Sequence, residues 1–426
     1  MILALSLYID PGTGSMLFSI FIGAAATLFF LGKAAILKLK LFLSGKKAGE
    51  AATDTSYKPY VIYNEGKQYQ NVFKPVCEAF EARKIPLAYY TSDEHDAAFS
   101  ANYEYVKPEF IGEGNRAFVH LNMLSAGVVL MTTPGLQVYQ MKRSKNVKHY
   151  AHILHAASDA TMYRLFGIDF FDSVLLSGDY QAKDIRYLEE QRGIPQKELV
   201  TVGCPYLDVL KAKMDAIPTE ENHPFTVLIS PSWGPSALLS KYGESLLTPL
   251  VESGWRIIVR PHPQSKKSEG EMLDALTKKY ADTPNLEWDY ERDNIYAMKK
   301  ADIMISDFSG IIYDYTFLCD KPVMYVNAEL NLKPYDAWFL PDNGKNIWQF
   351  SVLKKIGIEL KSEQFSDIKN VIQGISDNEN LAEARAKAKA EAWQHQGEAG
   401  EKIADFMIQT LSRIDNKTEE SKIKTA

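Results

Sequence analysis

The chain has 426 residues, a formal net charge of −6, 46% hydrophobic residues and 24% charged residues. This length exceeds one ordinary hydrophobic core and predicts two domains with additional segments, and the slightly acidic balance gives no indication of nucleic-acid binding. Cys77, Cys204 and Cys319 are scattered without metal-ligand or disulfide spacing. We therefore expect structural thiols in a reducing compartment, no metal site and no bound cofactor. The sequence leaves open whether Mg²⁺ accompanies a bound diphosphate.

The N-terminal residues have the pattern of a membrane anchor. No charged residue occurs between Asp10 and Lys33, and positions 16–31 are strongly apolar. At about 1.5 Å per residue, this uncharged run reaches roughly the thickness of a bilayer core. Five lysines precede the next acidic residue, Glu50. The positive-inside rule therefore predicts a single-pass anchor in residues 1–43, with everything after it in the cytoplasm. A cleaved signal peptide is the alternative, disfavoured because the positive cluster follows the apolar run.

Residues 44–59 are small, polar and charged, and predict a linker. Beyond it, short apolar runs alternate with amphipathic helical patterns, of which Tyr69–Lys84 is one example. This alternation predicts a parallel sheet with right-handed crossovers, and hence a Rossmann-like first domain in residues 60–215. Its expected strands are Tyr60–Tyr63, Leu87–Thr91, Ala117–Leu121, Val128–Thr132, Tyr150–Leu154, Ser173–Leu176 and Leu199–Val202.

A polar stretch at Lys213–Pro224 predicts a hinge, and the alternation resumes behind it as a second Rossmann-like domain in residues 225–375. Residues 376–414 predict C-terminal helices, and the polar residues 415–426 predict a disordered tail. Two such domains facing a cleft, with terminal helices, form the GT-B architecture of transferases, in which the ligand lies between the domains. The expected strands of the second domain are Phe225–Ile229, Arg256–Val259, Asn285–Trp288, Asp302–Ile305 and Pro322–Val326.

A polar turn in the second domain has the pattern of an anion site. Residues 306–310, Ser-Asp-Phe-Ser-Gly, join a buried strand to a predicted helix. Free backbone N–H groups and the helix dipole favour an anion at such a helix start. Ser309 is suited to cap the helix, and Gly310 permits close approach of a ligand. Ser306, Ser309 and Gly310 are therefore candidate phosphate-binding residues.

A second polar segment, Arg260-Pro261-His262-Pro263, follows the strand Arg256–Val259. Because ligands bind at the carboxyl ends of the strands in an open α/β sheet, we expect both segments to bind one ligand, a nucleotide diphosphate. His262 is able to donate a hydrogen bond to a pyrophosphate oxygen. Arg260 either forks onto a phosphate or forms a structural ion pair.

Two carboxylates, Asp307 and Asp314, are candidates for holding the ribose hydroxyls of the nucleotide, as acidic residues do in other nucleotide-binding folds. Solvated carboxylates are the alternative interpretation for both.

The first domain offers a candidate general base. His155 directly follows the apolar strand Tyr150–Leu154, which places it at the carboxyl edge of the predicted sheet. His152 lies earlier in the same strand and is the competing choice. The spacing alone does not decide between them.

A basic run precedes the same strand and includes Lys142, Arg143 and Lys145. A solvated basic loop is one interpretation. The other is a binding site for an anionic acceptor or for anionic lipid headgroups, which fits a chain tethered to a membrane.

The motifs resemble those of the CDP-glycerol glycerophosphotransferase family, whose members build glycerol-phosphate polymers of the teichoic-acid type on lipid-linked carriers. The resemblance runs from about Tyr60 to Ile414 and is strongest in the second domain. In the second domain, Arg260–Pro263 is similar to the family's Arg/His-Pro element, and Ser306–Gly310 with Asp314 is similar to its Ser-Asp-Tyr-Ser-Ser and Asp element. Pro231-Ser232-Trp233 matches the family's segment after the first strand of this domain. In the first domain, His155 stands at the family's His-Gly-Thr-Pro, and Gly203–Asp208 stands at its Gly-x-Pro-x-x-Asp.

The resemblance places Ser232 among the nucleotide-binding residues and favours His155 over His152 as the base. Departures from the family pattern indicate a divergent branch: Ala156-Ala157-Ser158 follows the histidine, and Gly234 and Gly310 replace a basic residue and a serine.

The function that this resemblance implies is transfer of a glycerol-phosphate or related polyol-phosphate unit from a CDP-linked donor to a lipid-linked or glycan acceptor. His155 would deprotonate the acceptor hydroxyl, and His262 with the Ser309–Gly310 turn would stabilise the departing CMP. Two alternatives are a sugar transferase that uses a nucleotide sugar, and an inactive GT-B module that scaffolds envelope assembly.

Overall fold

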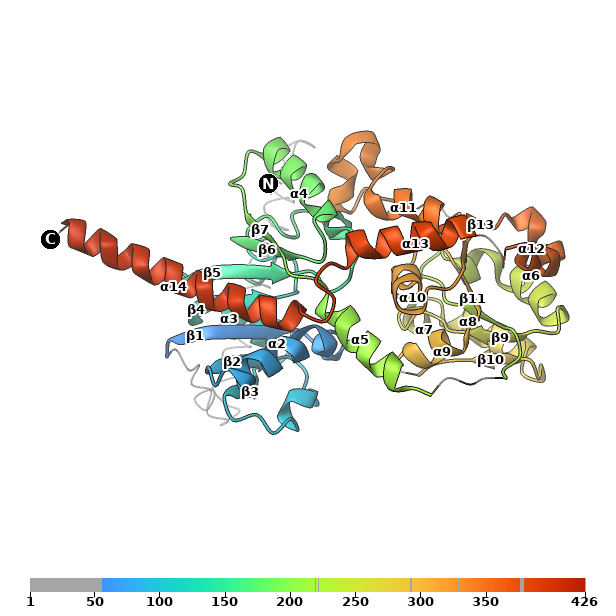
Figure 1. The fold of residues 1–426 in the computed structure, drawn as a ribbon, viewed down its shortest axis with the longest axis horizontal. Coiled ribbons are helices and arrows are strands. Elements are labelled where there is room, and N and C mark those ends of the chain that lie inside the picture. Colours follow the sequence, from blue (N-terminus) through green and yellow to red (C-terminus); the bar gives the residue numbers. More distant parts are fainter. Residues whose placement is uncertain are drawn as a thin grey trace, which may run out of the picture. The chain divides into compact units, whose positions relative to one another are not determined.

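Two parallel β-sheets organise the described part of the chain (Figure 1). The computed structural model describes residues 56–425, apart from 219, 221, 292, 328–329 and 376–378. The predicted anchor in residues 1–43 and most of the predicted linker lie outside these residues. Within the described ranges, no helix combines the length and the apolar character needed to cross a bilayer.

The first sheet has the strand order β3-β2-β1-β4-β5-β6-β7 in the described residues, and its neighbours are all parallel. Its central strands are buried on both faces, as expected for a parallel sheet covered by helices. The strands are β1 (Lys58–Asn64), β2 (Leu87–Thr91), β3 (Val106–Phe110), β4 (Ser125–Met131), β5 (Asn146–Ile153), β6 (Ser173–Leu176) and β7 (Glu198–Thr201). The helices of this domain are α2 (Gln70–Ala82), α3 (Asn115–Asn122), α4 (Tyr180–Arg192) and α5 (Pro205–Ala216).

Two strand assignments of the first domain need correction. The predicted strand Ala117–Leu121 is wrong, because these residues lie in helix α3. Its buried residues, Ala117 and Leu121, are four positions apart and share one helix face. Strand β3 was not predicted, because its sequence Val-Lys-Pro-Glu-Phe carries charges and a proline. Such residues are tolerated at a sheet edge, where β3 lies.

The second sheet has the order β10-β9-β8-β11-β12-β13 in the described residues and is also parallel. The predicted strands all occur, and only the short edge strand β13 was not predicted. The strands are β8 (Thr226–Ile229), β9 (Arg256–Val259), β10 (Leu286–Trp288), β11 (Ile303–Ser306), β12 (Val323–Tyr325) and β13 (Gly357–Glu359). The helices are α6 (Leu238–Glu252), α7 (Ser265–Ser268), α8 (Gly270–Lys279), α9 (Ile295–Lys300), α10 (Ile311–Cys319), α11 (Trp348–Ile356) and α12 (Ile368–Gln373).

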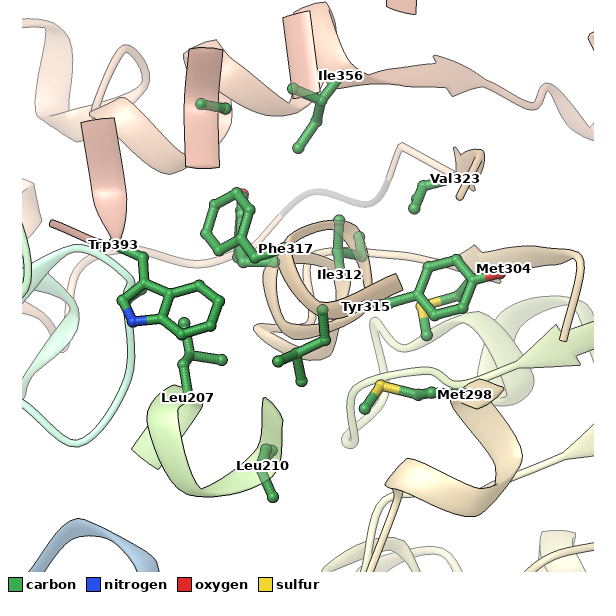
Figure 2. Packing of buried hydrophobic residues seen from close by; sticks show 14 of the residues in the cluster. Leu207, Leu210, Met298, Met304, Ile312, Tyr315, Phe317, Val323, Ile356 and Trp393 are labelled. Atoms are coloured by element: carbon green, nitrogen blue, oxygen red, sulfur yellow. The ribbon is translucent and has the colours of Figure 1, made fainter. Parts of the chain in front are cut away.

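One hydrophobic cluster joins the two domains. Figure 2 shows Leu207 and Leu210 of α5, from the first domain, near Ile312 and Phe317 of α10, with Trp393 beside them. All five side chains are at most 2% exposed. Burial of each large apolar side chain contributes roughly 1.5–3 kcal/mol. The domain contact is therefore part of the core and not a polar surface contact.

The chain returns from the second domain to the first at its C-terminal end. Helix α13 (Glu379–Ala392) packs against α10 and α11, whereas α14 (Ala399–Thr425) packs against α2 and β4 (Figure 1). The predicted disordered tail at residues 415–426 is wrong up to residue 425, because α14 continues through this polar stretch. Asp415 in this stretch forms an ion pair with Lys148, near the N-terminal end of β5.

A half-buried carboxylate fixes this return. Asp208 of α5 accepts hydrogen bonds from Trp393 Nε1 at 2.8 Å and from the backbone N–H groups of Gly397 and Ala399 at 2.8 and 3.2 Å. Gly203, at φ +93°, lies so close to Gln394 that an added Cβ would come within 2.5 Å of its carbonyl oxygen. The Gly203–Asp208 segment therefore holds the connection between α13 and α14.

We expect Asp208→Ala to lower the free energy of unfolding by about 2–3 kcal/mol, because three donors, one of them at the start of α14, lose a charged acceptor. Asp215→Ala is the matched control in the same helix, since Asp215 is exposed and forms only an i,i+4 pair with Lys211. Its effect should stay within about 0.5 kcal/mol. Urea unfolding of both variants checks this, and equal effects would contradict the role given to Asp208.

Candidate active site

Three polar segments meet at the carboxyl edge of the second sheet. They follow β8, β9 and β11, which are adjacent in the sheet order β9-β8-β11. Because parallel strands end at the same edge, Ser232, His262 and the turn 306–310 gather there. The sequence predicted that these polar segments lie at one edge of the second sheet.

The carboxylate of Asp307 connects two of these segments. It accepts hydrogen bonds from the backbone N–H groups of Ser232 at 2.9 Å, Leu238 at 2.8 Å and Ser309 at 3.2 Å. The side chain is 1% exposed. Burial raises the pKa of Asp307, while the hydrogen bonds from Leu238, Ser232 and Ser309 oppose that rise. Asp307 thus bonds to the protein backbone and shapes the loop after β8.

The start of α10 offers open backbone donors. Gly310 is the N-cap residue and no side chain caps the helix, so the predicted capping by Ser309 is wrong. In the described part of the chain, the N–H groups of Gly310 and Ile311 donate to no protein acceptor. The space where a Cβ of Gly310 would lie is empty to 4 Å. Ser306 Oγ donates to the carbonyl of Ser230 at 2.5 Å and so joins β11 to β8.

His262 is neutral and presents one ring donor. Its Nδ1 accepts a hydrogen bond from the N–H of Gln264 at 3.1 Å, which leaves the ring proton on Nε2. Burial lowers the pKa of His262, and the carboxylate of Asp307 opposes this change. The ring lies 6.3 Å from that of Trp233, which is 48% exposed. His262 therefore has Nε2–H available as a hydrogen-bond donor at neutral pH.

Arg260 is engaged within its own domain. Its guanidinium bonds to Asp289 at 2.7 Å and to the carbonyl of Glu291 at 2.6 Å, beyond the end of β10. Asp289 is buried, and the Arg260 side chain is 12% exposed. Of the two interpretations that the sequence offered for Arg260, the structure contains the ion pair.

Asp314 links the two domains. It lies in the first turn of α10 and hydrogen-bonds to Tyr206, in the first turn of α5. Burial raises the pKa of Asp314 from 3.8 to about 7. Asp314 is therefore not a solvated carboxyl group, because it is bonded to the phenol of Tyr206 in the other domain.

His155 lies just beyond β5, at the carboxyl edge of the first sheet. Its Nδ1 lies 3.2 Å from the hydroxyl of Tyr163, and its ring meets the edge of Tyr69 at 5.3 Å between ring centroids. Burial lowers the pKa of His155 to about 4. The ring is therefore neutral at pH 7, with a proton on one nitrogen and a lone pair on the other.

His152 points into the interior of the same domain. It is fully buried, and its Nε2 lies 3.1 Å from the same Tyr163 hydroxyl. Burial lowers its pKa to about 3. Of the two histidines, only His155 is accessible at the edge. Tyr163 was not identified from the sequence, because it lies in an irregular segment that matches no motif.

A second interdomain contact lies near His155. The carboxylate of Asp159 accepts from the N–H of Gln349 in α11 at 2.7 Å, and the amide oxygen of Gln349 accepts from Asp159 N–H at 3.4 Å. Burial raises the pKa of Asp159 to about 7. Asp159 therefore serves the domain contact.

The basic run lies at the opposite edge of the first sheet, because it precedes β5 and does not follow it. Arg143 pairs with Asp172 at 2.9 Å, donates to the carbonyl of Phe170 at 2.5 Å and covers the ring of Tyr150. Lys142 Nζ donates to the carbonyl of Gln137 at 3.1 Å, and Lys145 is exposed. The structure thus does not bring Lys142, Arg143 and Lys145 together with His155. Within the described ranges, no group of three or more His, Cys, Asp or Glu side chains is arranged to hold a metal.

Residues 126–337 match the family model described as CDP-Glycerol:Poly(glycerophosphate) glycerophosphotransferase. The chain belongs to this family. It is a glycerophosphotransferase-type enzyme, and the matched region contains His155, Ser232, His262 and the 306–310 turn. No curated protein sequence matches the chain significantly.

Solved structures share the fold at low identity. The wall teichoic acid polymerase TagF matches with a TM-score of 0.54 and 13% identity, over 90% of this chain and 98% of that chain. A variant of the same polymerase, soaked with CDPG, matches at 0.54 and 13%, over 85% and 90%. A putative UDP-N-acetylglucosamine 2-epimerase from Listeria monocytogenes matches at 0.52 and 12%, over 81% and 95%. These likenesses show a GT-B-like α/β fold for the glycerophosphotransferase.

Asp314 predicts a specific pH dependence of stability. A carboxyl with a raised pKa binds its proton more tightly when folded, so its contribution is complete below pH 3.8 and is lost as pH rises toward about 7. Asp314→Asn imitates the protonated form. We expect the variant to lose less stability than the wild type between pH 5 and pH 8, measured by urea unfolding. The exposed Asp282→Asn is the control, and an unchanged pH slope in Asp314→Asn would contradict the buried carboxyl.

Proposed function

We propose that this glycerophosphotransferase transfers a glycerol-phosphate, or a related polyol-phosphate, from a CDP-linked donor to a lipid-linked or glycan acceptor in the synthesis of a teichoic-acid-type envelope polymer. The family match supports the donor class. The observation that carries the proposal is the donor set at the carboxyl edge of the second sheet, which comprises open N–H groups at the start of α10 and the Nε2–H of His262. A diphosphate needs several such donors in one place.

In the proposed reaction, the diphosphate lies against the N–H groups of Gly310 and Ile311, and His262 donates to one of its oxygens. The hydroxyl of Ser232 is the fourth candidate donor. Phosphoryl transfer depends mainly on positioning and on neutralising charge in the transition state. Because these donors are fixed by Asp307 and by the fold, they require little reorganisation when the negative charge on the departing CMP develops.

We propose that the acceptor binds at the first domain, where His155 removes the proton of the attacking hydroxyl. That oxygen forms a bond to the distal phosphorus, the bond from this phosphorus to the bridging oxygen breaks, and the electron pair leaves with CMP. A neutral imidazole is required, and burial keeps His155 neutral at pH 7.

The polymerase and epimerase structures share this fold, so the fold alone does not exclude a nucleotide-sugar donor. An inactive scaffold is the third possibility. Both differ from the proposal in a measurable way, because only glycerol-phosphate transfer releases CMP from CDP-glycerol in step with acceptor extension.

Turnover of His155→Ala should fall by on the order of a hundred to ten thousandfold with the affinity for CDP-glycerol nearly unchanged, because a general base does not contact the donor. His262→Ala should lower turnover by about a hundredfold or more and also weaken donor binding. CMP release and calorimetric titration of CDP-glycerol separate the two effects. His95→Ala, at an exposed position, is the control. Full turnover in His155→Ala would remove this histidine from the role of base.

We also propose that residues 1–43 anchor the enzyme in the cell membrane by one pass, with the globular domains in the cytoplasm where CDP-linked donors are made. The lysine cluster after the apolar run supports this orientation. Reporter fusions after Lys47 and at Ala426 should both report the cytoplasm. An extracytoplasmic signal from either fusion would contradict the topology.

A further inference from the structure

The hydroxyl of Tyr163 lies between two histidines. It is 3.1 Å from Nε2 of His152 and 3.2 Å from Nδ1 of His155. The rings of Tyr163 and His152 meet edge to face, with centroids 5.2 Å apart and an interplanar angle of 86°. Burial raises the pKa of Tyr163, so the phenol keeps its single proton across the range in which the enzyme works. The phenol therefore has one proton to donate and two histidine nitrogens within reach, and the Thr132 side chain is a further hydrogen-bond partner of its oxygen.

His152 is held in place within the first sheet. It is fully buried in β5, where it pairs in register with Met131 of β4 and Val174 of β6, and its ring lies 4.8 Å from that of Phe171. Its Nδ1 has no hydrogen-bond partner in the described residues. The Tyr163 hydroxyl is thus the hydrogen-bond partner of His152, and a neutral ring here acts as a fixed anchor for that hydroxyl.

The backbone of Tyr163 is held by contacts with the second domain. Its carbonyl accepts a hydrogen bond from Asp336 N–H at 2.9 Å, and Arg164 forms an antiparallel bridge with Tyr335. Asp336 in turn accepts from the N–H groups of Phe166 and Gly167 and from Arg192. Residues 335–336 lie between β12 and α11 of the second domain. The position of Tyr163 therefore depends on contacts with both domains.

The single phenol proton couples the tautomers of the two histidines. If Tyr163 donates to Nε2 of His152, its oxygen accepts from Nδ1–H of His155, and Nε2 of His155 keeps a free lone pair. If Tyr163 donates to Nδ1 of His155, the proton of that ring lies on Nε2. Only the first arrangement leaves His155 with a lone pair directed away from Tyr163 and able to take a proton from a substrate.

We propose that Tyr163, anchored by His152, is the positioning residue that holds His155 in the Nδ1–H tautomer. This proposal rests on the proposed function of His155 as the base. When His155 accepts a proton from the acceptor hydroxyl, its Nδ1–H bond to the Tyr163 oxygen becomes charge-assisted and strengthens. The relay therefore favours the protonated state that the reaction passes through. In the described part of the chain, no carboxylate hydrogen-bonds to His155, and the titratable groups that meet its ring are Tyr69, Tyr163 and His152.

Kinetics of the full chain test this proposal. Tyr163→Phe should lower kcat about 10- to 100-fold with KM for CDP-glycerol unchanged, because only the base is affected. Loss of the relay also makes His155 a weaker base, so the acid limb of the kcat profile should move to lower pH. Tyr150→Phe is the matched control, since that hydroxyl accepts from Ser144 N–H at the other end of β5. Wild-type kcat, or an unmoved acid limb, in Tyr163→Phe would overturn the proposal.

A double-mutant cycle separates positioning from packing. His152→Leu should lower kcat as Tyr163→Phe does, and His152→Gln, which restores an acceptor near the position of Nε2, should recover most of it. The double variant Tyr163→Phe with His152→Leu should be no slower than the slower single variant, because both act through one relay. Fully additive losses, or no recovery in His152→Gln, would contradict a shared relay.

A readout independent of turnover separates this proposal from the proposed function. In the full chain labelled with [¹⁵N]histidine, His155 should show the Nδ1–H tautomer in the wild type and lose this preference in Tyr163→Phe. The Nε2–H tautomer in the wild type would overturn the relay even if His155→Ala abolishes turnover. Conversely, full turnover in His155→Ala with the Nδ1–H tautomer present would overturn only the role of the base.

Discussion

The buried carboxylate of Asp307 is the constraint on which the donor half of the site depends. A carboxylate that is 1% exposed must find donors in the protein, and Asp307 finds three backbone N–H groups on two segments. These bonds hold the loop after β8 against the turn after β11. Because Ser309 N–H is used inside the turn, the donors left open are those of Gly310 and Ile311 at the helix start. The position of the buried Asp307 carboxylate thus determines which N–H groups at the start of α10 remain open to bind an anion.

A similar use of carboxyl groups connects the two domains. Asp208 holds the return of the chain to α14, Asp159 bonds to Gln349, and Asp314 bonds to Tyr206. Each lies close to a carboxyl end of a strand or at the start of a helix that follows one. Tyr163, whose carbonyl accepts from Asp336 N–H, extends this connection between the domains to His155. Two of these carboxyls have pKa values raised to about 7, which makes the domain contact sensitive to pH near neutrality.

Sequence reasoning located the sheet edges well, because strand ends follow from apolar runs and polar turns. It placed His262, Ser232 and the 306–310 turn at one edge of one sheet, and the structure brings them together. It did not resolve partners that are distant in the chain. Asp289, which binds Arg260, lies 29 residues further on, and Tyr206, which binds Asp314, lies in the other domain. No local pattern encodes such pairs.

Other differences arise because tertiary contacts decide what the local pattern leaves open. A short, mostly apolar run such as Ala117–Leu121 fits a strand or a helix, and only tertiary packing decided for α3. The polar end of α14 lacked an apolar stripe, yet the helix continues there, with Asp415 paired to Lys148. Tyr163 belongs to an irregular segment, so its place between His152 and His155 follows only from the folded chain.

The proposed function depends first on the binding of a CDP-linked donor by the second domain. The most direct test is a thermal-shift comparison of the full chain with CDP-glycerol, CDP-ribitol, CMP and UDP-sugars. We expect stabilisation by the cytidine nucleotides and none by UDP-sugars, since a ligand that binds the native state raises its stability. Stabilisation by a UDP-sugar without a shift for CDP-glycerol would contradict the proposed function.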